Sequence, residues 1–514
     1  MPIVQQGSIN TTALVVPDLY VQIVPPQTLN LNGVPTNVLG VVGTAQWGPV
    51  NQPTIIGNMA MYAATFGAVQ NRKFDMGTQV ATAVQQGAQN FRCVRVTDGT
   101  DVAATVTVLT NCITFTALYT GTLGNSIVAS VAPGSKASSF KVTIGIPGLA
   151  AEVFDNIVGT GNALWIAMAA AINSGVGQLR GASNYVTATA GVGVTAPATA
   201  SYTLASGTDG TATITSTVLV GLDTVPRKGM YALRNQGVSV LILADADDST
   251  VWTTIDGFAL AEGMFAQQVF PSGTSIASSI TTKASAAIDS YATKMLAGDW
   301  CWWQDATNGV IRLVSPQGFS GGRYANLSPE QSALNKPLYG VVGTQKSGLN
   351  PLTAMTYSSA ELQALFQSGI DVITNPGAGG LVMNTLRDGN NSSSDPRVNG
   401  DNYTRLTNYI ASSLAAGMGL YVGRVINAEL FRQIRATLMS FLTNMLQQNM
   451  LGTLDGSLPF SVVCDLTNNP LSRTSLDYVQ ADVNVQYMGI NKYFIVNVQG
   501  GQTVVIQQPN SIVR

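Results

Sequence analysis

The sequence predicts a mixed α/β protein of several domains, in which a β-sandwich is inserted into a discontinuous αβ core. Strand-like and helix-like runs alternate over residues 36–97 and again from Thr224 onward. Between them, residues 101–222 are rich in Thr, Val, Ala, Ser and Gly, with short strands at regular spacing. Near the end, Ala428–Asn449 has the apolar period of an amphipathic helix, and strand-like runs follow it. The 514 residues are enough for roughly three or four domains.

The N-terminal part begins with an extended segment. Leu14–Val24 is strand-like, Pro17 restricts it to an edge or a strand start, and Pro25-Pro26 ends it. An αβ unit follows. It is expected to contain, in chain order, strands at Val38–Val42 and Thr54–Ile56, helices at Asn58–Phe66 and Met76–Gln86, and a strand at Phe91–Val96.

The Thr-rich stretch and the αβ stretch after it give these expected elements. The first has strands at Ala104–Leu109, Ile127–Ser130, Phe140–Ile144 and Ala212–Leu219, and a helix at Ala163–Asn173. The second has helices at Met230–Leu233, Val251–Gln268, Thr282–Ala297, Ala360–Gly369 and Tyr403–Ala416, and strands at Val238–Leu243, Trp300–Trp303, Val310–Val314, Val372–Ile373 and Leu381–Met383. Two loops are expected there, a turn-rich one at Ser315–Gly322 and a polar, mobile one at Arg387–Asp401.

The helix predicted at 428–449 has an unusual polar face. Amides and hydroxyls dominate it, and Arg432 and Arg435 are its only cations. A solvated helix face normally carries Glu and Lys, so this face is expected to meet another protein, with a merely polar surface as the alternative. The residues chosen for that contact are Arg432, Gln433, Arg435 and Thr437.

Strands are expected after this helix at Phe460–Leu466, Ala481–Met488, Lys492–Val498 and Gln502–Gln507. The last of them, around Thr503–Ile506, has no later strand to pair with. An unpaired strand edge is either a hazard or an interaction site.

The composition favours a subunit of a large assembly over a free enzyme. Only 10% of the residues are charged while 46% are hydrophobic, and the net charge is −2. Little like-charge repulsion therefore opposes self-association. No basic stripe indicates nucleic-acid binding, and no apolar run reaches the roughly 18 residues of a membrane span.

The chain contains no histidine, which excludes Ser-His-Asp and Cys-His nucleophiles, an imidazole base and His-ligated zinc. The four cysteines are Cys93, Cys112, Cys301 and Cys464, too far apart to indicate a zinc site or a disulfide framework. We expect all four to be reduced in the newly made subunit.

One stretch resembles a catalytic motif. An apolar strand ends in Asp245-Ala246-Asp247, the arrangement by which some phosphotransferases place a nucleophile and a Mg²⁺ ligand. The favoured interpretation is structural: Asp248 or Ser249 caps the following helix. The Gly-rich turn at 375–380 lacks the Lys-Ser/Thr of a P-loop, and Trp300–Trp303 fits a buried strand as well as a stacking platform. We assign no catalytic, cofactor or metal site.

Several motifs in chain order resemble the sheath protein of contractile injection machines, above all the tail sheath of contractile-tailed bacteriophages. They are Val16–Val21 (VPDLYV), Val41–Pro53 (VVGTAQWGPVNQP), Tyr62–Gly67 (YAATFG), Thr120–Ile127 (TGTLGNSI), Ser315–Ala325 (SPQGFSGGRYA) and Arg405–Ile410 (RLTNYI). Asp18 departs from the family, in which glycine is common at that position. Each motif is weak by itself, and their collinearity is what is specific.

The resemblance implies a subunit without a substrate, which polymerises as stacked hexameric rings around a tail tube and contracts to drive the tube through the host envelope. It also implies an N-terminal arm (1–26), an αβ unit packing with the C-terminal core (27–98), an inserted β-sandwich (99–222), a subtilisin-like αβ domain without peptidase activity (223–395), a C-terminal αβ core facing the tube (396–500) and a C-terminal arm (501–514). Implied partners are further copies of the chain, the tail tube, the baseplate and the tail terminator, in a virion tail assembled in the host cytoplasm.

A sheath must stay linked while its subunits move, and extended arms that add a strand to a neighbour's sheet meet that need. The arm residues expected from the sequence are Leu14, Val15, Val16, Leu19, Tyr20, Val21, Ile23, Thr503, Val504, Val505 and Ile506. The strands at 481–488 and 492–498 are the expected receiving sheet, and the alternative is that both termini pair within their own subunit. Other open alternatives are a pyocin or secretion-type sheath, a static shell or surface-layer protein, and a phosphotransferase around Asp245 and Asp247.

Overall fold

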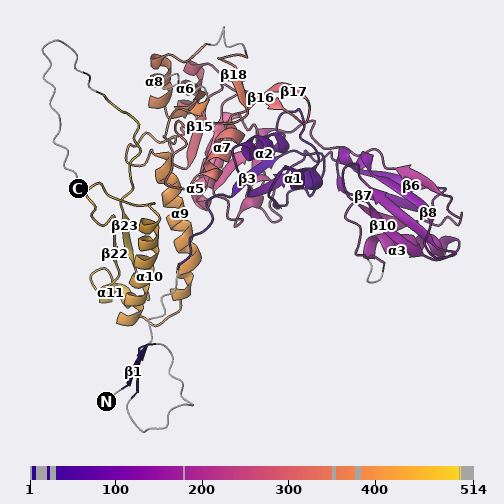
Figure 1. Cartoon of the computed structure of the whole chain (residues 1–514), viewed down its shortest axis with the longest axis horizontal. Coiled ribbons are helices and arrows are strands. Elements are labelled where there is room, and N and C mark those ends of the chain that lie inside the picture. The colour runs from indigo at the N-terminus through magenta and orange to yellow at the C-terminus, as the bar shows by residue number, and fades with distance from the viewer. Residues whose placement is uncertain are drawn as a thin grey trace.

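The computed structural model describes residues 3–6, 20–23, 31–176, 180–349, 355–376, 384–496 and 498. Their structure is mixed α/β and has three main regions, visible in Figure 1. We name them the central body (residues 38–97 and 223–400), the inserted region (98–222) and the C-terminal unit (401–488). The inserted region projects from one side of the central body, and the C-terminal unit lies on the other side.

A seven-stranded sheet forms the middle layer of the central body. Its strands, in order across the sheet, are β19 (Ile370–Asp371), β15 (Thr293–Leu296), β14 (Phe265–Val269), β13 (Val240–Leu243), β3 (Leu39–Gly43), β5 (Phe91–Arg95) and β4 (Thr54–Ile56). Neighbours are parallel except β4 and β5. Every residue of β3, β13 and β14 is buried, as expected for a parallel sheet covered on both faces.

Helices cover both faces of this sheet. On the face lined by Leu39, Val41 and Ile242 lie α1 (Met59–Phe66), α2 (Met76–Gln85) and α7 (Gln317–Asn326). On the face lined by Val42, Leu241 and Leu243 lie α5 (Trp252–Glu262), α6 (Ile276–Ser285) and α8 (Ser359–Gln367). Short 3₁₀ turns precede β13 (η3, Gly229–Leu233) and α5 (η4, Ser249–Val251).

Residues 27–98 were expected to pack with the C-terminal core. Leu31 does lie in the apolar core of the C-terminal unit, and the Val34 N–H donates to Ser413 Oγ (3.1 Å). The strands of this stretch lie in the central sheet instead, because β3 hydrogen-bonds with β13 from Leu39 to Val42 and with β5 on its other side. The stretch thus supplies three of the seven strands of that sheet, although the inserted region separates it in sequence from the other four.

The predicted loop at Ser315–Gly322 is wrong, because most of it is the start of α7. Glycine disfavours an isolated helix, but here it permits close packing. A Cβ at Gly318 would lie 2.0 Å from Thr82 Oγ1, and one at Gly322 would lie 2.4 Å from the Cα of Ala83. The glycines therefore let α7 lie directly against α2, and tertiary packing overrides local preference.

Three further predicted elements are wrong. The helix at Val251–Gln268 is α5 followed by β14, and the helix at Thr282–Ala297 is the end of α6 followed by β15. The strand at Ala212–Leu219 is replaced by the short helix α4 (Ser216–Val220). Strands β14 and β15 are buried on both faces, so they lack the alternation that distinguishes a strand from a helix in sequence.

The stretch Arg387–Asp401 was expected to be a polar, mobile loop. It forms no helix or strand before residue 401, as a loop should, and Ser394 and Arg397 are exposed. Other residues of this loop are buried, among them Asp388 and Asn391. The buried Lys294 donates to the carbonyls of Asp388 (3.0 Å) and Asn390 (2.7 Å). Part of the loop is therefore held inside the protein by hydrogen bonds.

Two smaller sheets complete the central body. Strands β17 (Val310–Val314), β16 (Cys301–Asp305) and β18 (Val341–Thr344) form an antiparallel sheet in that order. Strands β20 (Ile373–Thr374) and β21 (Thr385–Leu386) form an antiparallel pair. The expected strand at 381–383 lies outside the described residues.

Two antiparallel sheets share one apolar core in the inserted region. The first has the order β10 (Glu152–Ile157), β9 (Phe140–Gly145), β8 (Val128–Pro133) and β12 (Ala200–Thr203). The second has the order β11 (Val186–Ala190), β7 (Ile113–Thr120) and β6 (Ala103–Val108), and η2 (Thr122–Ser126) follows β7. Helix α3 (Asn162–Ser174) adds Leu164, Trp165 and Met168 to the same core.

The C-terminal unit consists of α9 (Asp401–Gly417), η5 (Met418–Tyr421), α10 (Ala428–Gln447), β22 (Phe460–Val463), α11 (Leu471–Thr474) and β23 (Asp482–Val485). Its core is separate from that of the central body and contains Leu406, Leu438, Phe441 and Phe460. Strands β22 and β23 pair antiparallel. Helix α10 agrees closely with the helix predicted from the sequence.

Two buried charged residues fix α9 to the central body. The Asp401 carboxylate accepts hydrogen bonds from Tyr324 Oη (2.6 Å) and Ser332 Oγ (2.7 Å). The Arg405 guanidinium donates to the carbonyls of Tyr324 (2.8 Å) and Leu327 (2.6 Å), and also to those of Ser328 and Gln331. These carbonyls lie at and just beyond the end of α7, where no intrahelical donor remains, so Arg405 caps that helix.

At the N-terminus, β1 (Ile3–Gln6) and β2 (Tyr20–Ile23) pair in parallel as a two-stranded sheet of their own. No helix within the described ranges combines the length and apolar character that crossing a membrane would require.

Candidate functional site

Asp245 lies where an α/β sheet of this kind would bind a ligand. The strand order reverses between β3 and β13, and Asp245 follows the carboxyl end of β13. Its buried carboxylate accepts from the Phe74 N–H (3.0 Å) and from Gln79 Nε2 (2.9 Å). Burial raises the pKa of Asp245, and the hydrogen bonds partly oppose that rise. The crevice is thus filled by the chain itself.

Gln79 Nε2 also donates to Ser315 Oγ (2.9 Å), so a carboxylate, an amide and a hydroxyl lie in series. The amide cannot take up the serine proton as an imidazole would. Ser315 is 1% exposed, so this series of hydrogen bonds has no opening for a substrate.

The other acids of the phosphotransferase hypothesis also have structural partners. Asp247 pairs with Lys73 at 2.8 Å. Asp248 accepts from the Thr250 N–H (3.0 Å) as the N-cap of η4, which is the capping role favoured from the sequence. No cluster of three acidic, cysteine or histidine side chains suited to a metal ion occurs among the described residues.

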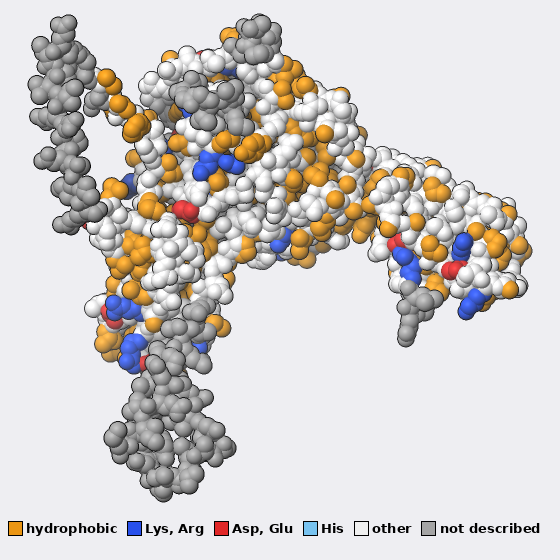
Figure 2. All heavy atoms as spheres, viewed as in Figure 1, with side chains coloured by type: hydrophobic (Ala, Val, Ile, Leu, Met, Phe, Trp, Pro, Cys, Tyr) orange, Lys and Arg blue, Asp and Glu red, His pale blue; other side chains and the backbone are white. Residues whose placement is uncertain are grey.

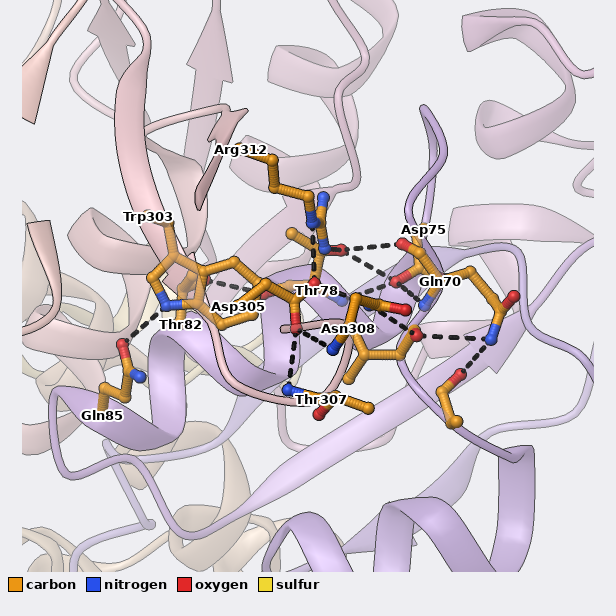
Figure 3. A network of polar contacts seen from close by, with 12 residues as sticks. Gln70, Asp75, Thr78, Thr82, Gln85, Trp303, Asp305, Thr307, Asn308 and Arg312 are labelled. Atoms are coloured by element: carbon orange, nitrogen blue, oxygen red, sulfur yellow. Dashed lines mark hydrogen bonds and ion pairs between the residues drawn. The ribbon is translucent and has the colours of Figure 1, made fainter. Parts of the chain in front are cut away.

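A polar network of the central body surrounds the start of α2 (Figure 3). Asp75 caps α2 by accepting from the Thr78 N–H and Oγ1, both at 2.8 Å. Burial raises the pKa of Asp75 to about 7. Arg312 joins this helix to the β16–β17 hairpin, because it pairs with Asp305 (2.8 Å) and donates to Thr78 Oγ1 (2.6 Å). The network is a structural connection between two elements.

The tryptophans proposed as a stacking platform are part of the core. Trp300 and Trp303 are buried. Their indole N–H groups donate to the Phe270 carbonyl and to Gln85 Oε1, each at 3.0 Å. All four cysteines are free thiols and buried.

The polar face of α10 is mostly exposed. Arg432 and Arg435 are exposed, and Arg432 pairs with Glu429 one turn earlier on the helix. Gln433 is half-buried and donates to Glu429 Oε1 (3.0 Å). Thr437 was expected on this face, but it is buried and shares a 2.6 Å hydrogen bond with Tyr421 Oη. The prediction for Thr437 was therefore wrong, because a hydroxyl can satisfy its hydrogen bonding inside the unit.

A groove that the sequence did not predict lies beside α10. It measures about 760 Å³ and lies between the connection 422–426, the first turns of α10 and the segment 474–481. Val422 (84%), Val425 (79%) and Tyr478 (65%) are strongly exposed on its walls. One feature of the sequence could have indicated this groove: the connection at 422–426 between two helices is mainly apolar, whereas such connections are usually polar.

The sheet next to this groove has only β22 and β23 among the described strands. Phe460 and Val462 of β22 face α10 and are buried, while the outer edges of the two strands have no described partner. A two-stranded sheet with free edges is a ready site for strand addition.

The predicted strand at Lys492–Val498 is wrong for the described residues, which contain no strand after β23. The chain instead runs along α9. Tyr487 stacks on Tyr403 with 5.7 Å between ring centroids, and Lys492 contacts Asn390 Oδ1. Beyond Lys492, the large apolar side chains Tyr493, Phe494, Ile495, Val496 and Val498 are all strongly exposed. Among the described residues, this segment pairs with no strand of its own subunit.

The arm residues are only partly described. Tyr20, Val21 and Ile23 lie in β2, which pairs with β1 of the same chain. The following predicted arm residues lie outside the described residues: Leu14, Val15, Val16, Leu19, Thr503, Val504, Val505 and Ile506.

The chain matches no protein-family model and no curated protein. Solved structures do resemble it. The sheath tail protein from Desulfitobacterium hafniense has a TM-score of 0.58 at 15% identity, covering 86% of this chain and 93% of that one. The sheath tail protein from Listeria innocua has a TM-score of 0.60 at 14% identity, covering 85% and 90%. The sheath of an extracellular contractile injection system in the contracted state has a TM-score of 0.53 at 10% identity, covering 96% and 99%. The chain therefore has the fold of the sheath tail proteins of contractile injection systems.

Proposed function

We propose that this chain is the structural subunit of a contractile tail sheath. Copies would form stacked hexameric rings around a tail tube and contract to drive the tube through a host envelope during genome delivery. The observation that supports this most is the extent of the fold likeness, which reaches 96% of this chain and 99% of a sheath protein in a contracted assembly. Such a subunit works by changing its lattice and needs no active site.

The domain division inferred from the resemblance belongs to this proposal. In it, residues 99–222 are an outward-facing insertion, residues 223–395 are a subtilisin-like αβ domain without peptidase activity, and residues 396–500 face the tube. The short arms 1–26 and 501–514 connect subunits. The low charge of the surface in Figure 2 suits a protein that spends its working life among copies of itself.

Strand addition would link the subunits. The free edges of β22 and β23 would receive the N-terminal and C-terminal arms of neighbouring copies, because main-chain hydrogen bonds form whatever the side chains are. The exposed apolar side chains of Tyr493, Phe494, Ile495, Val496 and Val498 support this, since they directly precede the C-terminal arm in the sequence and are not buried by their own subunit. The pairing of β1 with β2 is the competing arrangement within one chain.

The proposed partners are further copies of this chain, a tail tube protein, a baseplate and a tail terminator, and the proposed location is the virion tail. A sheath of a pyocin or secretion-type machine is the nearest alternative, and it uses the same fold. A static shell or surface layer would also be charge-poor and polymeric, but its lattice would have a single geometry.

Electron microscopy of purified protein tests the proposal. A sheath forms helical tubes of two diameters, one extended and one contracted. Tubes or sheets of one fixed geometry would point to the static shell, and a monomer that turns over phosphate esters would restore the phosphotransferase hypothesis.

Truncation tests the arms. Deleting residues 1–24, or residues 502–514, should leave a folded subunit that no longer polymerises. A truncated protein that still forms contractile tubes would contradict strand exchange.

The exposed arginines of α10 test the contact with the tube. The pair Arg432→Glu and Arg435→Glu should weaken attachment of the sheath to the tube without unfolding the subunit, because both side chains are exposed. Normal extended tails in the double variant would show that this face is not the tube contact.

A further inference from the structure

A cavity of about 390 Å³ lies at the joint between the central body and the C-terminal unit. Three parts of the chain enclose it: the segment 34–36 that leads into β3, the turns 235–239 and 262–264 before β13 and β14, and one face of α9. Figure 1 shows α9 passing beside α5, which ends at this place. The cavity is thus bounded by both regions at once.

The walls are mainly apolar. They include Val34, Pro35, Val238, Met264 and the ring of Tyr409. Two glycines leave the space open. Gly263 has a φ of 67°, and a Cβ there would meet only Ser412 Oγ at 3.4 Å, while a Cβ at Gly237 (φ 66°) would meet nothing within 4 Å. The turns therefore contribute backbone to the walls where a side chain would have filled the cavity.

The charges at the edge of the cavity are already paired. Glu262 forms an ion pair with Arg234. The Arg405 guanidinium donates to four carbonyls of the central body, as described above. The polar groups left to meet a ligand are neutral. The Asn408 amide donates to the Met264 carbonyl (3.3 Å). The side-chain oxygens of Asn408, Ser412 and Tyr409 can each accept a hydrogen bond.

We propose that this cavity binds a small, uncharged aromatic molecule of one or two rings that carries a hydrogen-bond donor. The volume lies in the range of ligand sites, which favour apolar walls with a few polar groups and often occur between domains. A charged ligand would find no free counter-charge here. The ring would pack against Met264, Val238 and Tyr409, and its donor would reach an acceptor on α9.

A ligand in this position touches the central body and α9 together, so it stabilises their present arrangement. A bound molecule raises the stability of the form that binds it in proportion to the logarithm of its concentration. This inference does not depend on the sheath function, because it concerns the isolated subunit. If the chain is also a sheath subunit, the bound ligand would stabilise the joint between the central body and the C-terminal unit within the sheath.

Indole is a suitable probe, since it is neutral, aromatic and has one N–H donor. We expect the thermal unfolding midpoint of the full-length subunit to rise by several degrees as indole is added, and to go on rising with the logarithm of the indole concentration once that exceeds the dissociation constant. Ser412→Phe should abolish the rise, because its ring would occupy the cavity. Ser440→Phe, at a half-buried serine of α10 away from the cavity, should keep it.

Saturation transfer from bound indole to the Met264 methyl group gives a second readout that needs no variant to fold. Transfer to Met264 supports the site. The proposal is overturned if indole gives no transfer and no rise in the midpoint of the wild-type subunit, or if both serine variants respond as the wild type does. All of these measurements use unassembled subunits, so their failure leaves the polymerisation tests unaffected.

Discussion

The central body and the side of the C-terminal unit that lies away from it differ in how they treat polar and apolar side chains. The central body buries charge: Lys294 and Asp371 form an ion pair at 2.8 Å with each side chain 1% exposed. The C-terminal unit leaves large apolar side chains in the open, among them Val422 and Leu471, and so does the segment after it at Phe494, each more than 80% exposed. The first region is complete within one chain, whereas the second has a surface that suits a partner.

Substitutions in the two regions should therefore differ in their effect on the free energy of unfolding. Removing one partner of a buried ion pair leaves a charge without compensation in a medium of low polarity. Removing an exposed apolar side chain changes little in the free subunit but removes area from any interface it forms. Four variants test this contrast, from the largest expected effect on the free energy of unfolding to the smallest.

Lys294→Met should have the largest effect. It leaves the Asp371 carboxylate buried without its ammonium partner and deprives the Asp388 and Asn390 carbonyls of a donor. We expect a loss of about 3–5 kcal/mol in unfolding free energy, measured by chemical denaturation. The control is Arg227→Met, which removes an ion pair to Asp223 whose side chains are 40% and 44% exposed, and should cost less than about 1 kcal/mol. Equal losses in the two variants would remove the distinction between buried and exposed charge.

Asp75→Asn should change how stability depends on pH. Burial raises the pKa of Asp75 to about 7 in the folded chain, above the ordinary value of 3.8. The folded state therefore holds a proton that the unfolded state has lost, so this group destabilises the fold increasingly as pH rises from about 4 to about 7. This loss of unfolding free energy is at most about 4 kcal/mol, because the pKa rises by about three units and each unit corresponds to about 1.4 kcal/mol.

The Asp75→Asn variant lacks this pH-dependent destabilisation because an amide does not titrate. Its amide oxygen can still accept from the Thr78 N–H. The difference in unfolding free energy between wild type and variant should thus grow between pH 4 and pH 7 in favour of the variant. Asp388, whose pKa is also raised to about 7, is present in both proteins and cancels in the comparison. If the unfolding free energies of wild type and variant changed in parallel between pH 4 and pH 7, Asp75 would not be the source of the pH dependence.

Thr437→Val should have an intermediate effect within the C-terminal unit. It removes the 2.6 Å hydrogen bond to Tyr421 Oη and leaves a buried hydroxyl without that partner. We expect a loss of about 1–3 kcal/mol. Thr443→Val, at an exposed position of the same helix, is the matched control and should stay within about 0.5 kcal/mol of the wild type. If both substitutions are neutral, Thr437 belongs on the surface after all.

The double variant Val422→Ser and Val425→Ser should have the smallest effect on stability and a large one on assembly. Both side chains are exposed in the free subunit, so unfolding free energy should change by less than about 0.5 kcal/mol. Polymerisation, followed by light scattering, should be weakened because the groove loses its apolar walls. The matched variant Val192→Ser and Val194→Ser changes two exposed valines of the inserted region and should polymerise normally. Equal polymerisation of both variants would show that the groove is not an interface.

Elements whose pattern is local could be predicted from the sequence alone. Helix α10 follows from its 3.6-residue apolar period and from Asn427, whose side chain caps it by accepting from the Leu430 N–H (2.8 Å). The absence of histidine, which excludes imidazole chemistry, is likewise a property of composition alone. The collinear motifs anticipated the fold that the solved sheath tail proteins share with this chain.

Features that depend on contacts between distant residues could be found only in the folded structure. The glycines of α7 were assigned to a loop because local preference disfavours a helix, whereas contact with Thr82 and Ala83 makes small residues necessary there. Strands β14 and β15 looked helical because strands buried on both faces show no alternation. The burial of Thr437 and the groove beside Tyr478 likewise arise where segments far apart in sequence meet, and no local pattern records such a meeting.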